Sequence, residues 1–149
     1  MTIQVQINGA DALRRDLPSI PKTMEASVLR QMSQIAYDSA QRGAGSHSRS
    51  GGSGALLQSL YNRSIPNGRE VGHDPGRAPH ALFVNFGTRP HEIRPKSKKA
   101  LRWAAGGIFR FAKVVKHPGY RGDPYITRAA DDAIRQFAAI VDKATQEAK

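Results

Sequence analysis

The chain has 149 residues, no cysteine and a formal net charge of +11, from 23 Lys and Arg against 12 Asp and Glu. The length predicts a single domain over residues 1–149, because domains commonly run to about 100–200 residues. The lack of cysteine excludes disulfides, thiolate metal sites and cysteine nucleophiles. No apolar run approaches the ~20 residues of a membrane span. The Met1–Ile7 segment alternates polar and apolar residues without a basic start, so we expect no signal peptide.

The positive charge is confined to the middle of the chain. Residues 1–40 hold four basic and four acidic groups, and residues 122–149 hold four and five. Residues 41–85 hold five and two, whereas residues 86–121 hold ten and one. Aromatic and β-branched residues interrupt this basic stretch, which is unlike a disordered basic tail.

The first third predicts a strand and a long helix. Thr2–Ile7 alternates like a strand, and residues 10–17 suit a short helix that the following prolines end. Residues 22–42 then have helical periodicity, with Thr23 as N-cap and Gly43 as the stop. The apolar stripe of this helix comprises Met24, Val28, Met32, Ile35 and Ser39, with Leu29, Ala36 and Ala40 beside it.

Residues 43–54, GAGSHSRSGGSG, predict a flexible Gly/Ser-rich loop. A phosphate-binding loop would need Gly-Lys-Ser/Thr between a strand and a helix. Here the glycines follow a helix, no Gly-Lys occurs, and Ser48 stands where a dinucleotide motif needs its third glycine. The loop interpretation is therefore favoured.

The middle of the chain predicts short strands. Residues 55–61 suit a short helix or strand, and residues 63–66 and 69–72 read as strands around a Pro-Asn-Gly turn. Residues 73–79 are irregular, and residues 80–86 are a short apolar piece. Gly106-Gly107 between residues 100–105 and 108–116 is a strong signal for a two-residue β-hairpin.

The C-terminal segment predicts a second long helix, with Asp123 as N-cap and Pro124 at the first helical position. Its predicted buried stripe is Ile126, Ala130, Ala133, Ile134, Phe137, Val141 and Ala144. The order of elements indicates an α+β fold, with an antiparallel or mixed β-sheet packed against two long amphipathic helices. The expected core includes Phe86, Trp103, Phe111, Ile126, Ile134 and Phe137.

No catalytic, cofactor-binding or metal-binding constellation emerges from the sequence. The five histidines show no zinc-ligand spacing, and His73, Asp74 and His80 are the only local cluster. Serines 46–53 lie in the stretch expected to be most mobile, where a nucleophile could not be held rigidly. Glu92 is the only carboxylate in residues 86–121. We therefore expect a protein that is not an enzyme and has no cofactor.

Three interpretations of the basic segment remain open. Cations near Trp103, Phe109, Phe111 and Tyr120 suit phosphate contacts and base stacking. The same cations suit acidic protein partners or neighbouring subunits. Alternatively, the segment is a solvated sheet face with its aromatics in the core. The candidate interface residues are Arg49, Arg89, Arg94, Lys96, Lys98, Lys99 and Arg102.

Four segments, in this order, carry a resemblance to a known family. They are SGALLQSL at 53–60, HALFVNFGT at 80–88, IRPKSKKAL at 93–101, and VKHPG at 115–119 followed by PYI at 124–126. Together they resemble the small tail-component family of long-tailed bacteriophages, the neck proteins called tail-completion or head–tail joining proteins. Asn85 departs from the acidic residue that the family often has there, so an ion pair between subunits at this position would be missing.

The resemblance implies a structural protein of the virion that forms a ring, six-fold or twelve-fold, at the head–tail joint. Implied partners are further copies of the chain, adaptor or connector proteins, and tail-terminator or tail-tube proteins, with DNA passing through the lumen and no membrane. A tail terminator or a head-closure ring is an alternative within the class. A basic nucleic-acid-binding module is the alternative from another class. Assembly would take place in the host cytoplasm.

Overall fold

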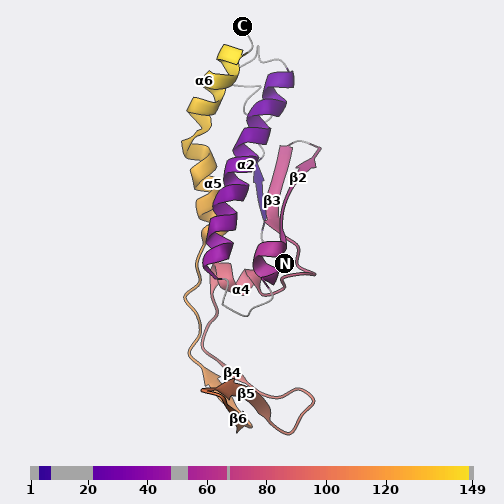
Figure 1. Cartoon of the computed structure of the whole chain (residues 1–149), viewed down its shortest axis with the longest axis vertical. Coiled ribbons are helices and arrows are strands. Elements are labelled where there is room, and N and C mark those ends of the chain that lie inside the picture. The colour runs from indigo at the N-terminus through magenta and orange to yellow at the C-terminus, as the bar shows by residue number, and fades with distance from the viewer. Residues whose placement is uncertain (1–3, 8–21, 48–53, 67, 148–149) are drawn as a thin grey trace.

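The computed structural model describes residues 4–7, 22–47, 54–66 and 68–147. They form a body of helices and a small sheet, from which one long excursion of the chain projects (Figure 1). We call residues 87–122 the arm, and the other described residues the body. The predicted α+β class is confirmed. The helix expected at residues 10–17, the loop residues 48–53 and Arg49 lie outside the described residues.

Helix α2 (Lys22–Ser46) is the long N-terminal helix that the periodicity predicts. One row along it is buried and packs on the rest of the core, namely Val28, Met32, Ala36, Ala40 and Ala44. The predicted stop at Gly43 is wrong, because the helix continues to Ser46. Gly43 serves packing instead: a Cβ placed on it would lie 2.5 Å from the Tyr125 Cβ.

The sheet of the body has the order β1-β3-β2 and is antiparallel throughout. Its strands are β1 (Gln4–Ile7), β2 (Leu60–Ile65) and β3 (Gly68–His73), and the short helix α3 (Ala55–Gln58) precedes β2. The predicted strand pair around the Pro-Asn-Gly turn is therefore confirmed. Opposite residues share a face. The face with Leu60 and Val71 joins the core that α2 covers.

The C-terminal segment forms two helices, α5 (Tyr125–Arg135) and α6 (Phe137–Glu147), where one was predicted. The helix is interrupted at Gln136, which separates α5 from α6. Because the dihedral angles of Gln136 stay in the right-handed helical region, α6 continues the general course of α5 beside α2 (Figure 1). The predicted N-cap at Asp123 is also wrong. Pro124 occupies that position, and the Asp123 carboxylate forms ion pairs with His47 and Arg128.

The core contains Ile126 as expected, and Phe137 packs at its edge. Four other residues expected in the core are exposed, with exposed fractions of 64% for Phe86, 40% for Trp103, 66% for Phe111 and 64% for Ile134. Trp103 and Phe111 are exposed because the arm that carries them leaves the body, and Phe86 is exposed at the end of α4, where the arm begins. Ile134 faces away from α2, since Ala129 and Ala133 form the buried row of α5.

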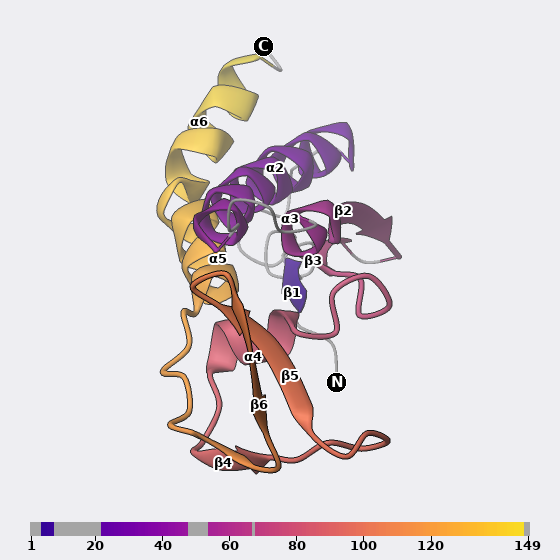
Figure 2. The same ribbon diagram turned by 60° about the horizontal axis from the view of Figure 1, so that its bottom comes forward.

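The arm begins after helix α4 (Ala81–Phe86) and contains two separate strand pairs. Nearer to the body along the chain, β4 (His91–Ile93) pairs with β7 (Val115–His117). Farther along the chain, β5 (Leu101–Ala105) and β6 (Ile108–Ala112) form the predicted hairpin (Figure 2). Both turn glycines have positive φ, 62° and 78°, which suits a two-residue hairpin turn. The single strand predicted at 108–116 bends at Lys113, because its two halves pair with different strands.

Replacing Gly43 with alanine should destabilise the protein. The new Cβ overlaps the Tyr125 side chain, and such overpacking costs about 1–3 kcal/mol. Gly45 on the same helix is the matched control, because a Cβ there meets no atom within 4 Å. Gly45→Ala should raise the free energy of unfolding by up to ~1 kcal/mol through helix propensity. Urea unfolding of both variants measures the difference, and equal effects would contradict the packing role of Gly43.

Candidate functional site

The outgoing and returning segments of the chain pass very close to each other where the arm joins the body. The Thr88 amide donates to the Tyr120 carbonyl at 2.7 Å, and the Tyr120 amide donates back at 2.9 Å. Gly87 and Gly122 have φ of 78° and 79°, and a Cβ on Gly122 would lie 2.4 Å from the Gly87 nitrogen. Glycine is required at both positions, since side chains would collide with backbone and the left-handed conformation would strain them.

A buried chain of hydrogen bonds lies in the body near this junction. His73 Nε2 is 2.6 Å from the Tyr125 hydroxyl, and His73 Nδ1 is 2.7 Å from Ser59 Oγ. Ser59 Oγ donates to the Leu56 carbonyl at 2.7 Å. Ser59 Oγ therefore accepts from Nδ1–H, while Nε2 accepts from Tyr125. Every member is satisfied when His73 is neutral, so this network holds structure together.

Burial sets the protonation states in this network. It lowers the pKa of His73 from 6.5 to about 4, so the imidazole is neutral near pH 7. It also raises the pKa of the Tyr125 hydroxyl, which stays a donor. A serine beside a neutral histidine resembles part of a hydrolytic site. Here, however, Ser59 and His73 are both buried, and the Ser59 hydroxyl donates its hydrogen bond to the Leu56 carbonyl.

Charged groups fix the returning end of the arm. Asp123 contacts His47 at 2.8 Å and Arg128 at 2.5 Å. The hydrogen bond from Arg128 lowers the pKa of the Asp123 carboxyl below its ordinary value. The Asp123 amide donates to the Val84 carbonyl at 2.8 Å. This residue therefore connects α4 with the end of α2 and the start of α5.

Asn85 lies inside the subunit, with an exposed fraction of 2%. Its Oδ1 accepts from the Ile126 amide at 3.3 Å. Its Nδ2 has no hydrogen-bond partner among the described residues. In this chain the position that the family resemblance marks as often acidic therefore joins α4 to α5, and is not available for an ion pair between subunits.

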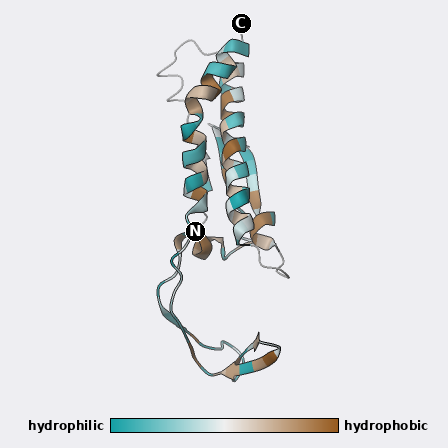
Figure 3. Ribbon diagram, turned by 60° about the vertical axis from the view of Figure 1, so that its left-hand side comes forward, coloured by the Kyte–Doolittle hydropathy of each residue, from teal (hydrophilic) through white to brown (hydrophobic). Residues whose placement is uncertain are grey.

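The β5–β6 hairpin exposes large apolar side chains on both faces. Figure 3 shows hydrophobic residues, in brown, along the ribbon of this hairpin. The register places Phe109 and Phe111 on one face with Arg102, and Trp103 and Ile108 on the other. Their exposed fractions are 58% for Phe109, 66% for Phe111, 40% for Trp103 and 71% for Ile108. The interpretation that these aromatics form a core is therefore wrong. A two-stranded sheet without cover is marginal in water, so the hairpin has the properties of an interface.

The predicted interface cations gather on the arm and are exposed there, namely Arg89, Arg94, Lys96, Lys98, Lys99 and Arg102. Two of them have partners within the arm. Arg94 pairs with Glu92 at 2.7 Å, and the Arg102 guanidinium carbon lies 4.5 Å from the centroid of the Phe109 ring. The arm thus presents cations and aromatic rings side by side, as the interleaved sequence indicates.

A hollow at the base of the arm was not foreseen from the sequence. Its volume is about 790 Å³, and its apolar lining includes Phe83, Ile93 and Tyr120. His91 and His117 stack beside it, with ring centroids 5.0 Å apart. The signal available in the sequence was glycine at positions 87, 119 and 122, at both ends of the arm, because glycine tolerates positive φ and close approach of two backbones.

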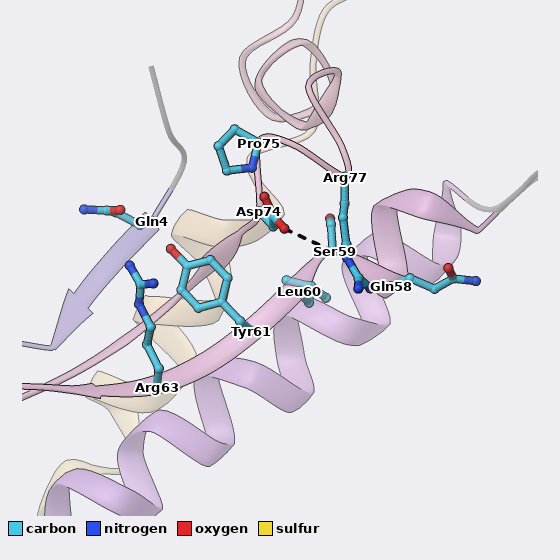
Figure 4. Close-up of a pocket in the computed structure, with 9 residues that line it drawn as sticks. All are labelled: Gln4, Gln58, Ser59, Leu60, Tyr61, Arg63, Asp74, Pro75 and Arg77. Carbon is cyan, nitrogen blue, oxygen red and sulfur yellow. Dashed lines mark ion pairs between the residues drawn. The ribbon is translucent and has the colours of Figure 1, made fainter.

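A second hollow of about 590 Å³ lies beside β2 (Figure 4). Its charged groups have partners: Arg63 contacts Glu70 at 2.7 Å, and Arg77 contacts Asp74 at 3.9 Å. Tyr61 donates to Glu70 at 2.5 Å, and burial, with this hydrogen bond, raises the pKa of Tyr61 to about 12. These groups satisfy one another, so this hollow is a weaker candidate for a binding site than the arm.

Within the part of the chain that the structure describes, no group of three or more His, Asp or Glu is placed to hold a metal ion. No helix among these residues is long and apolar enough to cross a membrane. Comparison of the chain with protein-family models, curated proteins and solved structures finds no match. The arm, with its exposed aromatics and cations, is the best candidate for a functional site.

The pKa of His73 predicts how stability depends on pH. Because the folded-state pKa, about 4, lies below the ordinary 6.5, the unfolded chain takes up a proton more readily than the folded one. The contribution of neutral His73 to the free energy of unfolding is therefore complete above about pH 6.5. It is lost as the pH falls towards 4, by up to ~3 kcal/mol. Urea unfolding between pH 7.5 and 4 should show this fall. The fall should be smaller in His73→Gln and the same as in the wild type in His91→Gln, a control at an exposed position. Equal pH profiles for all three proteins would show that His73 does not cause the pH dependence.

Proposed function

We propose that the chain is a structural virion protein of a tailed bacteriophage neck, and that it forms a homo-oligomeric ring which joins or completes the tail at the head–tail interface. It acts by assembly and not by catalysis. The observation that carries the proposal is the arm, which exposes aromatic rings on both faces of an isolated hairpin. The family resemblance supplies the biological setting.

The energetics of the hairpin favour association. Contiguous exposed apolar surface marks interaction sites in soluble proteins, and its burial is worth roughly 25 cal/mol per Å². Two bulky side chains project from each face of the hairpin. A partner on one face alone would leave the other in water, so two contacts per arm are possible. A protein that meets neighbours on two sides suits a ring.

The proposal also gives the charge a role. In a ring, the arm's cations face acidic groups of neighbouring subunits, of adaptor or connector proteins, of tail-terminator or tail-tube proteins, or the phosphates of DNA in the lumen. A tail terminator or head-closure ring would use the same features at another level of the neck.

Removing aromatic rings from the hairpin should weaken self-association while leaving the body folded. Native mass spectrometry should show a closed oligomer of the wild-type chain, with six or twelve copies. The double variant F109S/F111S should weaken association at least tenfold, because burial of one such ring contributes about 1.5–3 kcal/mol. Leu57→Ser, at an exposed apolar position of α3, is the control. A wild-type chain that stays monomeric and is absent from virions by electron microscopy would overturn the proposal.

A nucleic-acid-binding module is the second candidate, favoured by the exposed cations that lie beside Trp103, Phe109 and Phe111. Cationic grooves with aromatic platforms bind single strands, and cations alone bind duplex phosphates. This candidate predicts strong binding of the isolated chain to nucleic acid without assembly.

The salt dependence of DNA binding separates the two candidates. A nucleic-acid-binding module should lose affinity steeply between 50 and 200 mM salt, with a logarithmic slope of about −0.9 per phosphate contact on duplex DNA. The variant K96A/K98A/K99A should then reduce that slope by about 3, whereas Lys143→Ala on α6 should not. Weak binding by the wild-type chain at both salt concentrations would favour the ring protein.

A further inference from the structure

The outer face of α5 and α6 carries an exposed stripe that the body does not use. Asp131, Ile134, Ala138 and Asp142 follow one another at helical spacing and are all exposed. The stripe crosses the break between the helices because Gln136 keeps helical dihedral angles. Ile134 is 64% exposed although the sequence pattern places it in a core. We call these four residues the α5–α6 stripe.

The carboxylates of the stripe are free to meet a partner. The cations on the same helices are engaged elsewhere, since Arg135 pairs with Asp132 at 3.3 Å and Lys143 lies 3.8 Å from Glu147. Among the described residues, Asp131 and Asp142 form no ion pair. The stripe therefore presents two unpaired negative charges on either side of an apolar centre.

The β5–β6 hairpin has the complementary composition. On each face a cation lies directly opposite an aromatic residue, Arg102 across from Phe111 and Arg110 across from Trp103. Contact between two arms is disfavoured, because residues 86–121 hold ten basic groups and one acidic group. The hollow at the base of the arm is lined by Arg89 and three histidines but by no carboxylate that could pair with the hairpin arginines. The charge complementarity therefore selects the stripe.

The hairpin cannot reach the stripe of its own chain. Helix α5 runs away from the base of the arm, and the arm projects from the opposite end of the body from α6 (Figures 1 and 3). A contact between these two surfaces therefore joins different copies.

We propose that the β5–β6 hairpin of one copy docks on the α5–α6 stripe of a second copy. This inference rests on the proposed self-assembly and names its interface. Each copy carries one hairpin and one stripe, so the contact is head-to-tail and closes into a ring when the rotation between copies allows. The aromatic residues of the hairpin cover Ile134 and Ala138, while its arginines pair with Asp131 and Asp142.

Charge exchange tests the interface in the full-length chain. Variant D131K/D142K and variant R102E/R110E each place like charges in the contact, so native mass spectrometry should show each alone associating at least tenfold more weakly than wild type. An equal mixture should assemble, because both contacts between unlike variants are complementary. The mixed rings should alternate and hold an even number of copies. If either variant alone assembles like wild type, or the mixture fails although both variants keep the wild-type circular dichroism, the interface is wrong.

Cysteine cross-linking gives an independent readout, since the natural chain has no cysteine. Phe109→Cys mixed with Ile134→Cys should form a disulfide between the two chains on mild oxidation, whereas Phe109→Cys mixed with Leu57→Cys should not. A disulfide of Phe109→Cys with Phe83→Cys in place of Ile134→Cys would move the docking site to the hollow and overturn the inference. Wild-type oligomers without the Ile134 cross-link would overturn this interface alone. A monomeric wild-type chain would overturn the proposed function as well.

Discussion

The packing of Tyr125 between α2 and β3 is the contact on which both the body and the arm depend. Its ring lies against Gly43, where any side chain would collide with it, and its hydroxyl reaches His73 at 2.6 Å. Tyr125 also stands three residues after Gly122, where the arm returns. One buried side chain, 1% exposed, thus fixes the approach of α5 to α2 and the place where the arm re-enters the body.

Apart from Tyr125, many of the residues buried between α2 and α5 are small. The second half of α2 buries Ala36, Ala40 and Ala44, and α5 buries Ala129 and Ala133. By contrast, four of the five phenylalanines are more than half exposed. Most aromatic residues are largely buried in stable domains. This chain leaves much of its bulkiest apolar surface exposed, which is the allocation that the proposed assembly requires.

The sequence predicted the elements whose signals are local. The helical period of α2 and the Gly106-Gly107 turn appear as expected, because short-range sterics and periodicity determine them. The strand pair predicted at residues 63–66 and 69–72 also appears, with each strand extended to Leu60–Ile65 and Gly68–His73. The α+β class followed from their order. The end of α2 was misjudged because glycine indicates a helix stop in isolation, whereas here tertiary contact with Tyr125 requires it.

Features that depend on contacts between distant parts of the chain could not be predicted from local sequence patterns. Phe86, Phe111 and Ile134 look like core residues because apolar periodicity does not reveal whether a partner element exists to cover them. The arm depends on the crossing of Gly87 and Gly122, which lie far apart in the sequence. For the candidate interface, which stays a prediction, composition indicated one segment, and the described candidate cations are all exposed on the arm. It could not show that the aromatics beside them are exposed too.

The distribution of charge explains how such an arm persists in water. Exposed aromatic residues favour collapse onto one another, but ten cations against one acidic group in residues 86–121 repel each other and keep the segment extended. The same excess of charge disfavours pairing of one arm with another through the open edges of β5 and β6. In the proposed assembly, apolar surface supplies the affinity of the arm, whereas its cations restrict the partners to acidic surfaces. On that proposal, the net charge of the chain gives specificity for acidic partners and does not by itself indicate nucleic-acid binding.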